Sequence, residues 1–354
     1  MTVNVSMPLE NGAAMSRFRP PAISQVSLGG FWAPRIAAIR AKTVPALFLR
    51  CESAGMFEQI DPARPVPALR IPFSNKHVTR QMFWDCTVGK MLEDAANCLA
   101  HGRDDALEAM VDRVVDMFAR LQQPDGYMNS WFIRMRPGGR WTNLRDCHEI
   151  YCAGLLAEAA VAYYHSTGKR RFLDIVCRYI DHIDSQFGPE PGKRRGYCGH
   201  EVAEMALVKL YRATGERRYL ELSKFFVDER GQQPHYYDEE AAARGETADE
   251  FPRGTYEYNQ SHLPVREQEK VVGHAVRATY LYSGMADIAA EFGDASLRAA
   301  LERLWDDLLT KRTYVTGGIG PSAHNEGFTT DYDLPNETAY AETCAAIGLA
   351  HVFL

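Results

Sequence analysis

Two segments of the sequence repeat one pattern, and this repeat restricts the fold more than any other feature. Residues 163–173 (YYHSTGKRRFL) match residues 210–220 (LYRATGERRYL). In each copy a helix is predicted to end on a Thr-Gly C-cap, and a second helix begins within a few residues. A third pair is predicted to open at Gly273-His274 and to turn near Phe292-Gly293-Asp294. Antiparallel hairpins of this kind bury their apolar faces only by stacking side by side.

Apolar residues at three- and four-residue spacing extend the pattern to most of the chain. A further hairpin is predicted before the turn Pro124-Asp125-Gly126. The fold class is therefore all-α. The segment 231–266 interrupts the hairpins, and we expect it to fold as a rim loop in which Tyr236, Tyr237, Tyr256 and Tyr258 could stack on a sugar. The predicted helices cover residues 33–53, 80–101, 104–122, 147–167, 169–186, 200–214, 216–230, 267–291, 295–311 and 337–354.

Composition and charge exclude several classes of protein. The 46% of hydrophobic residues can build a sizeable core, and 40 Lys+Arg against 46 Asp+Glu leave no basic excess for nucleic-acid binding. Without a run of about 18 apolar residues or a secretory signal pattern, the chain is expected to be soluble and cytoplasmic. The eight cysteines form no CxxC pair, which favours free thiols, one or two of them metal ligands, over disulfides.

Histidines stand at three equivalent places in the hairpin repeat. His148 and His200 each precede a glutamate at the expected start of a helix, and His274 opens the third pair. If the first helices of the hairpins run parallel, the three side chains line one pit. Each histidine could instead cap its helix or pack against it, so the pattern leaves both interpretations open.

The polar segment from Tyr314 to Cys344 is predicted to be a shaped loop that carries chemistry. Glu326, with Glu342 and the histidines across the pit, resembles the two-acid arrangement of glycosidases. Other carboxylates compete for these roles, namely Asp331, Asp333, Glu201 and Glu267. The chain lacks the HExxH pattern of zinc proteases and the Gly-x-Ser-x-Gly elbow, and its Gly-Gly-Ile-Gly run lacks the spacing of a phosphate loop.

Glu342 and Cys344 offer one oxygen and one sulfur donor for a metal ion. Residues two apart diverge by about 200° on a regular helix, so both reach one ion only where a helix starts. Asn336, as an N-cap after Pro335, would provide such a start nearby. A buried thiol beside a surface carboxylate is the alternative, and a metal site needs three or four ligands.

Four ordered blocks of motifs, from about Gly29 to the end of the chain, resemble glycoside hydrolase family 127, the β-L-arabinofuranosidase family. The blocks are Trp141-x-x-Leu-Arg-Asp-x-His148-Glu-x-Tyr-Cys-Ala-Gly, Gly196-Tyr-Cys-Gly-His200, Pro264-Val-Arg-Glu-Gln with Gly273-His274-Ala-Val-Arg-Ala, and Thr316-Gly-Gly-Ile-Gly through Asp331-Tyr-Asp-Leu-Pro-Asn to Ala341-Glu-Thr-Cys344-Ala.

The resemblance implies an (α/α)6 barrel that releases β-L-arabinofuranose or a related sugar with retention. It implies a zinc ion held by one glutamate and three cysteines, one of them the nucleophilic thiolate. Glu326 matches the general acid/base, and Glu342 and Cys344 match two zinc ligands. His148, His200 and His274 match the residues that hold the sugar hydroxyls.

The sequence departs from the family pattern after Cys344. The family has two adjacent cysteines, one the nucleophile, and then β-sandwich domains, whereas this sequence has no later cysteine. We therefore expect an extension at 1–30 and a truncated barrel domain at 31–354, without β-sandwich domains. This fragment would have an incomplete zinc site and would need a complementing C-terminal piece or a homo-oligomer. The alternatives are an inactive carbohydrate-binding fragment and a metal-free unsaturated-uronyl hydrolase.

Overall fold

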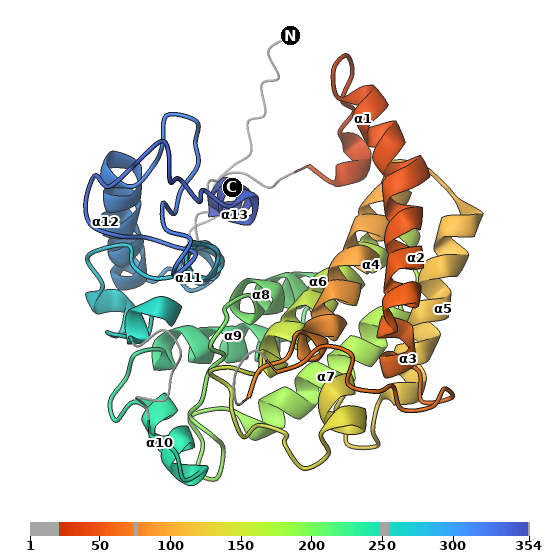
Figure 1. Cartoon of the computed structure of the whole chain (residues 1–354), viewed down its shortest axis with the longest axis horizontal. Helices are drawn as coiled ribbons and strands as arrows, with labels where there is room; N and C mark the ends of the chain where they lie inside the picture. The colour runs from red at the N-terminus through yellow and green to blue at the C-terminus, as the bar shows by residue number, and fades with distance from the viewer. Residues whose placement is uncertain (1–20, 74–76, 248–254, 353–354) are drawn as a thin grey trace.

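The computed structural model describes residues 21–73, 77–247 and 255–352. Helical hairpins follow one another around an arc, from α4 and α5 to α11 and α12 (Figure 1). The described residues contain isolated β-bridges but no strand, so the all-α class is confirmed. The four hairpins are α4 (Trp84–Ala100) with α5 (Asp105–Leu121), α6 (Glu149–Thr167) with α7 (Arg171–Gln186), α8 (Ala203–Thr214) with α9 (Arg217–Glu229), and α11 (Ala275–Phe292) with α12 (Ala295–Lys311).

Shorter elements complete the chain. A nearly continuous helical stretch at the start is made of α1 (Ala33–Ala38), the π-helical η2 (Ile39–Thr43), α2 (Val44–Ala54) and α3 (Met56–Ile60). The end of the described chain is α13 (Thr343–Val352), which packs against α11. The remaining short helices are η1 (Ile23–Gln25), η3 (Arg80–Phe83), η4 (Trp131–Met135), α10 (Tyr236–Ala243), η6 (Tyr256–Asn259) and η7 (Val265–Glu267).

The first helices of the hairpins form an inner layer. Helix α4 packs on α6, α6 on α8, α8 on α11 and α11 on α13, while α5, α7 and α9 lie outside. Helix α6 is buried on all sides from Glu149 to Val161, whereas α7 buries one stripe that includes Phe172, Val176 and Tyr179. A helix surrounded by protein can be apolar all round, and an outer helix needs only one apolar face.

Glycines allow the inner helices to approach closely. A Cβ at Gly154 would lie 3.0 Å from the Cα of Ala203 in α8, and one at Gly89 would lie 3.2 Å from the backbone of Leu155 in α6. Small residues at a crossing let two helix backbones come together without displacing larger side chains. This close contact brings the beginnings of successive inner helices near one another.

The predicted hairpin turns are confirmed. Gly168, Gly215 and Gly293 are left-handed C-caps with φ of 74°, 78° and 66°. Asp294 then caps α12 by accepting from the Leu297 amide at 3.0 Å. The Thr-Gly pattern therefore located these helix ends correctly.

Two predicted helix starts are wrong. Helix α11 begins at Ala275 instead of 267, because Gly273 has φ +72° and packs against the backbone of Glu257. Helix α13 begins at Thr343 instead of 337, because the amides of Tyr340 and Ala341 bond to the carbonyls of Pro321 and Gly320. In both cases the sequence pattern predicts helical residues, but a contact with a distant segment holds these residues in a non-helical conformation.

The insertion 231–266 differs in part from the expected rim loop, because it contains helix α10. Residues 248–254 lie outside the described residues. Closure into an (α/α)6 barrel and a boundary near residue 31 remain predictions. All eight cysteines are described and none forms a disulfide. Among the described helices, none combines the length and apolar character that crossing a bilayer requires.

Candidate active site

The three histidines predicted to face one pit lie side by side. His148 precedes α6, His200 lies shortly before α8, and His274 is the N-cap of α11. The ring centroids are 5.3 Å apart for His148 and His200, and 5.7 Å apart for His200 and His274. Packing of the inner helices thus brings together residues that are far apart in the sequence.

Two of these imidazoles are held by backbone carbonyls. The Nδ1 of His148 lies 2.8 Å from the carbonyl oxygen of Asp146, and the Nδ1 of His200 lies 2.9 Å from that of Glu201. A carbonyl oxygen only accepts, so each Nδ1 carries the hydrogen. In the neutral rings Nε2 is therefore the acceptor.

The surroundings keep the three rings neutral. Burial, with the Arg277 charge next in importance, lowers the pKa of His148 to about 3. The same two causes lower the pKa of His200 well below its ordinary value. Burial also lowers the pKa of His274, although Glu326 opposes this shift. Neutral imidazoles suit a site that hydrogen-bonds uncharged hydroxyl groups.

Glu326 lies directly beside His274. The Nε2 of His274 is 3.0 Å from Oε2 of Glu326, and the Nδ1 of His274 accepts from the Arg277 amide at 3.3 Å. This ring therefore carries its hydrogen on Nε2 and donates it to Glu326, unlike His148 and His200. The Glu326 side chain is 34% exposed, so it can reach a bound molecule.

The loop that carries Glu326 is fastened to the start of α11. Ala275 donates its amide to the carbonyl of Glu326 at 3.1 Å, and Phe328 donates to that of Gly273 at 2.9 Å. Glu326 itself has φ 52°, a strained value for a residue with a side chain. These backbone bonds hold the strained turn and set the position of the carboxylate.

Arg277 is a residue of this site that the sequence analysis missed. Its guanidinium donates to the carbonyl of Gly199, next to His200, and lies 4.5 Å from the ring centroid of Tyr258. It joins the start of α11 to the segment before α8. The signals that could have found it were its place one turn after His274 and its presence in the block Gly273-His274-Ala-Val-Arg-Ala.

The insertion tyrosines are distributed differently from the prediction. Tyr258 is 5.6 Å from the His274 ring, whereas Tyr256 stacks on His235 and Tyr237 is fully buried. Tyr236 lies beside Tyr197, in another part of the molecule. Only Tyr258 among these four contacts the histidine site directly through a described ring contact.

The competing carboxylates are held elsewhere. Glu201 is buried 3.0 Å from Arg230, and Asp331 lies 2.7 Å from Arg312. Asp333 accepts from Thr329 at 2.7 Å, and Glu267 is exposed in η7. Glu326 is thus the candidate carboxylate with a described bond to one of the three histidines.

Glu342 and Cys344 lie together at the start of α13. Glu342 directly precedes the helix, which starts at Thr343, so the predicted start with Asn336 as its N-cap is wrong. Burial and then a hydrogen bond to Glu342 raise the pKa of the Cys344 thiol. The described residues contain no group of three or more His, Cys, Asp and Glu that could hold a metal. Two donors do not fit a tetrahedral zinc site.

Comparisons with known proteins agree with the motif analysis. Residues 25–352 match a family model described as the catalytic domain of GH127 β-L-arabinofuranosidase. The chain is 42% identical over 276 residues to the non-reducing end β-L-arabinofuranosidase of Bifidobacterium longum subsp. longum, a match that covers 76% of this chain and 42% of the relative.

Solved structures with related folds were also found. A GH127 β-L-arabinofuranosidase from Geobacillus stearothermophilus T6 matches with a TM-score of 0.87 and 45% identity, over 91% of this chain and 51% of that one. Another GH127 β-arabinofuranosidase matches with a TM-score of 0.82 and 38% identity, over 94% and 50% of the two chains. The chain thus spans about half the length of these relatives.

Proposed function

Because the chain belongs to the GH127 β-L-arabinofuranosidase family, we propose that it forms the sugar-binding and proton-donating part of a retaining β-L-arabinofuranosidase. Its substrate would be a terminal β-L-arabinofuranosyl group or a related sugar. The observation that carries the proposal is the contact of Glu326 with His274 beside two further neutral histidines. The family match favours this function over a metal-free unsaturated-uronyl hydrolase.

In this proposal the histidines bind the sugar hydroxyls. The acceptor Nε2 atoms of His148 and His200 would take hydrogen bonds from hydroxyl groups. Neutral rings do so without the cost of burying a charge. Tyr151 supports this arrangement, because its ring centroid is 4.3 Å from that of His200.

Glu326 would supply the proton for the leaving group. Its Oε2 accepts from His274, and this bond orients the carboxyl group that would pass a proton to the glycosidic oxygen. Bond cleavage leaves the alcohol protonated and Glu326 ionised. Glu326 would then recover a proton from the water that releases the sugar.

The nucleophile is proposed from the family resemblance alone. It would be a zinc-bound cysteine thiolate outside residues 1–354, with Glu342 and Cys344 as two of the zinc ligands. A complementing C-terminal piece or a second subunit would then complete the site. The roles of Glu326 and the histidines do not depend on that assignment.

The test compares release of aryl β-L-arabinofuranoside by residues 1–354 and by the protein joined to a family-type downstream sequence. Turnover is expected only with the longer protein, and it should fall when Glu326 is replaced by Gln. Absence of turnover in the completed protein would contradict the proposed substrate.

A second candidate is carbohydrate binding without catalysis, which the two-donor metal site favours. Calorimetry with arabinose would then show binding by residues 1–354, and His274→Ala would abolish it. Turnover by residues 1–354 alone would contradict this alternative.

A further inference from the structure

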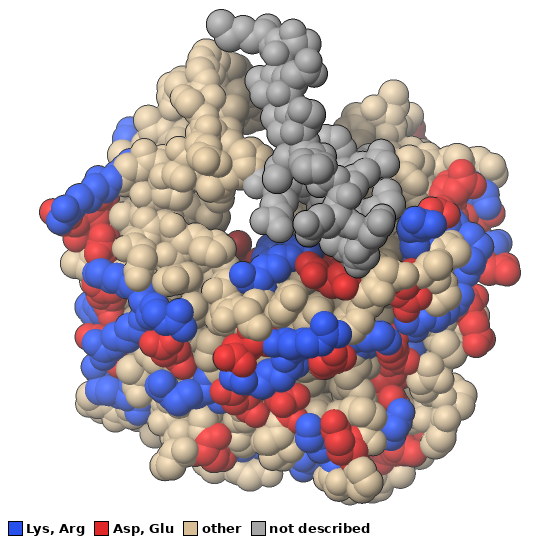
Figure 2. Space-filling view, turned by 180° about the vertical axis from the view of Figure 1, so that it is seen from behind, with Lys and Arg blue, Asp and Glu red and all other residues tan. Residues whose placement is uncertain are grey.

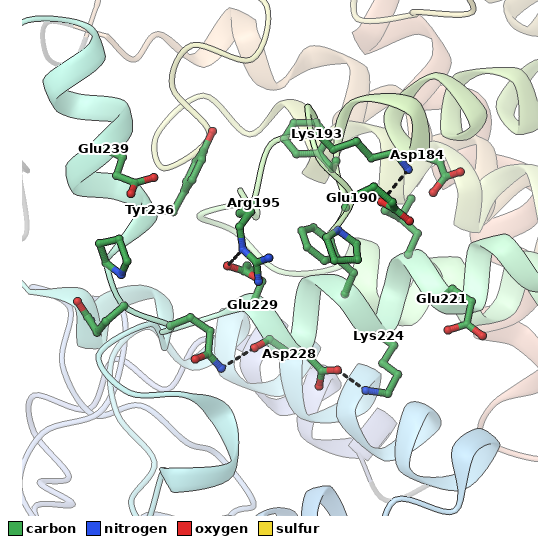
Figure 3. A pocket seen from close by; sticks show the side chains of 18 residues that line it. Asp184, Glu190, Lys193, Arg195, Glu221, Lys224, Asp228, Glu229, Tyr236 and Glu239 are labelled. Atoms are coloured by element: carbon green, nitrogen blue, oxygen red, sulfur yellow. Dashed lines mark hydrogen bonds and ion pairs between the residues drawn. The ribbon is translucent and has the colours of Figure 1, made fainter.

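A second hollow lies apart from the histidine site. It is a groove of about 820 Å³ between the end of α7, the loop 187–195, α9 and the start of α10 (Figure 3). None of its lining residues belongs to the histidine site. Its volume is in the range of pockets that hold small organic ligands, about 300–1,000 Å³.

Most charges in this groove are neutralised within the protein. Arg195 binds Glu229 through two hydrogen bonds of 2.9 and 2.5 Å, and Lys193 lies 3.2 Å from Glu190. Asp228 binds Lys224 and lies 2.6 Å from Arg266. Paired charges attract an ionic ligand weakly, but their remaining oxygens and N–H groups can still hydrogen-bond a neutral one.

Three other polar groups in the groove are available to a ligand. The carboxylates of Asp184 and Glu239 and the hydroxyl of Tyr236 make no hydrogen bond or ion pair within the described part of the chain, although the Lys193 charge attracts Asp184. In Figure 3 Asp184 lies at one end of the groove, and Tyr236 and Glu239 lie at the other. Acceptors at both ends suit a ligand with hydroxyl groups along its length.

The groove also has a fixed aromatic wall. The Tyr236 ring is half-buried and packs so closely on Gly196 that a Cβ there would overlap it. Phe225 of α9 also lines the groove and is 9% exposed. Aromatic rings pack favourably against the C–H faces of sugars, and a rigid wall reduces the entropy lost on binding.

We propose that this groove is a second carbohydrate site that binds a neutral oligosaccharide without cleaving it. The proposal rests on the proposed function for the choice of carbohydrate. Hydroxyl groups would donate to Asp184 and Glu239 and accept from Arg195, while one sugar face packs against Tyr236. The segment from Arg195 to His200 joins the groove to the histidine site, and Tyr197 within it is fully buried.

The test measures binding of arabinotriose to residues 1–354 by calorimetry and by the NMR shifts of labelled tyrosine. The groove variant combines Asp184→Ala, Glu239→Ala and Tyr236→Phe, which keeps the ring. Loss of these hydrogen bonds is expected to weaken groove binding at least about tenfold. Asp174→Ala, an exposed site on the same helix α7, is the matched control and should bind like the wild type.

His274→Ala separates this proposal from the proposed function. Groove binding should persist in His274→Ala and be at least about tenfold weaker in the groove variant. If His274→Ala removes all binding and the groove variant removes none, the second site is contradicted while the proposed function stands. Binding of spermidine or citrate in the groove in place of arabinotriose would also overturn the proposal. Unchanged circular dichroism of each variant would show that the fold is retained.

Discussion

The Nε2 of His274 lies 3.0 Å from Oε2 of Glu326, although the two residues are 52 positions apart in the chain. Backbone hydrogen bonds on both sides of Glu326 secure this contact. The ring N–H of His274 orients the Glu326 carboxylate beside the other two histidines. The pair therefore forms the centre of the proposed site.

Replacing Glu326 by Gln should reduce turnover of substrates with poor leaving groups by about 10²- to 10⁴-fold, because glutamine cannot donate a proton to the departing oxygen. The measurement is kcat of the completed enzyme on an alkyl arabinofuranoside. A dinitrophenyl arabinofuranoside is the control, since its leaving group needs little protonation and should lose much less rate. Equal losses on both substrates would contradict an acid role.

Gly327→Ala should displace Glu326 without unfolding the hairpins. A Cβ at Gly327 would overlap the carbonyl oxygen of Gly273, so the loop must move away from α11. We expect turnover to fall while the circular dichroism of the helices is retained. Gly29→Ala is the control, because no atom lies within 4 Å of a Cβ there. Full activity of Gly327→Ala would show that the contact is dispensable.

Arg230→Met should destabilise the protein by about 3–5 kcal/mol, because it leaves two buried carboxylates without their cation. Arg230 is fully buried and lies 3.0 Å from both Glu201 and Glu204. Urea unfolding gives the free energy of unfolding. Arg218→Met, which removes partly exposed ion pairs, should cost less than about 1 kcal/mol. Similar losses of unfolding free energy in both variants would contradict a larger contribution from the buried ion pairs of Arg230 than from the exposed pairs of Arg218.

His148 should make stability depend on pH. Its pKa in the folded protein, about 3, is below its ordinary 6.5, so its contribution is complete above pH 6.5 and is lost as pH falls towards 3. The variant His148→Asn has no imidazole at this position and should not lose stability in this way as pH falls. Between pH 7 and pH 4.5 the wild type should therefore lose more unfolding free energy than the variant. Parallel losses in urea titrations would contradict the buried neutral state.

Chelation should leave the melting temperature of residues 1–354 unchanged, because two donors hold zinc weakly. Elemental analysis after dialysis should find much less than one zinc per chain, and Cys344→Ser should not alter that content. The completed protein provides the positive control. One retained zinc per chain of residues 1–354 would mean that further ligands exist within it.

Local physics explains which features could be predicted. Apolar spacing and the Thr-Gly caps identified the hairpins because neighbouring residues determine where such helices end. The nearly balanced 40 Lys+Arg and 46 Asp+Glu agree with Figure 2, in which basic and acidic side chains are intermingled on the face shown. Motif order singled out Glu326 and the three histidines, although spacing alone left other carboxylates in competition.

Contacts between distant segments decided the rest. The late start of α11 depends on the backbone of Glu257, and the link from Arg277 to Gly199 depends on how α11 packs beside α8. The groove forms between α7, the loop 187–195, α9 and α10, and Arg195 of the loop pairs with Glu229 of α9. Periodicity and capping therefore determined the helices from short-range interactions, whereas the geometry of both sites depended on packing between segments that no local pattern encodes.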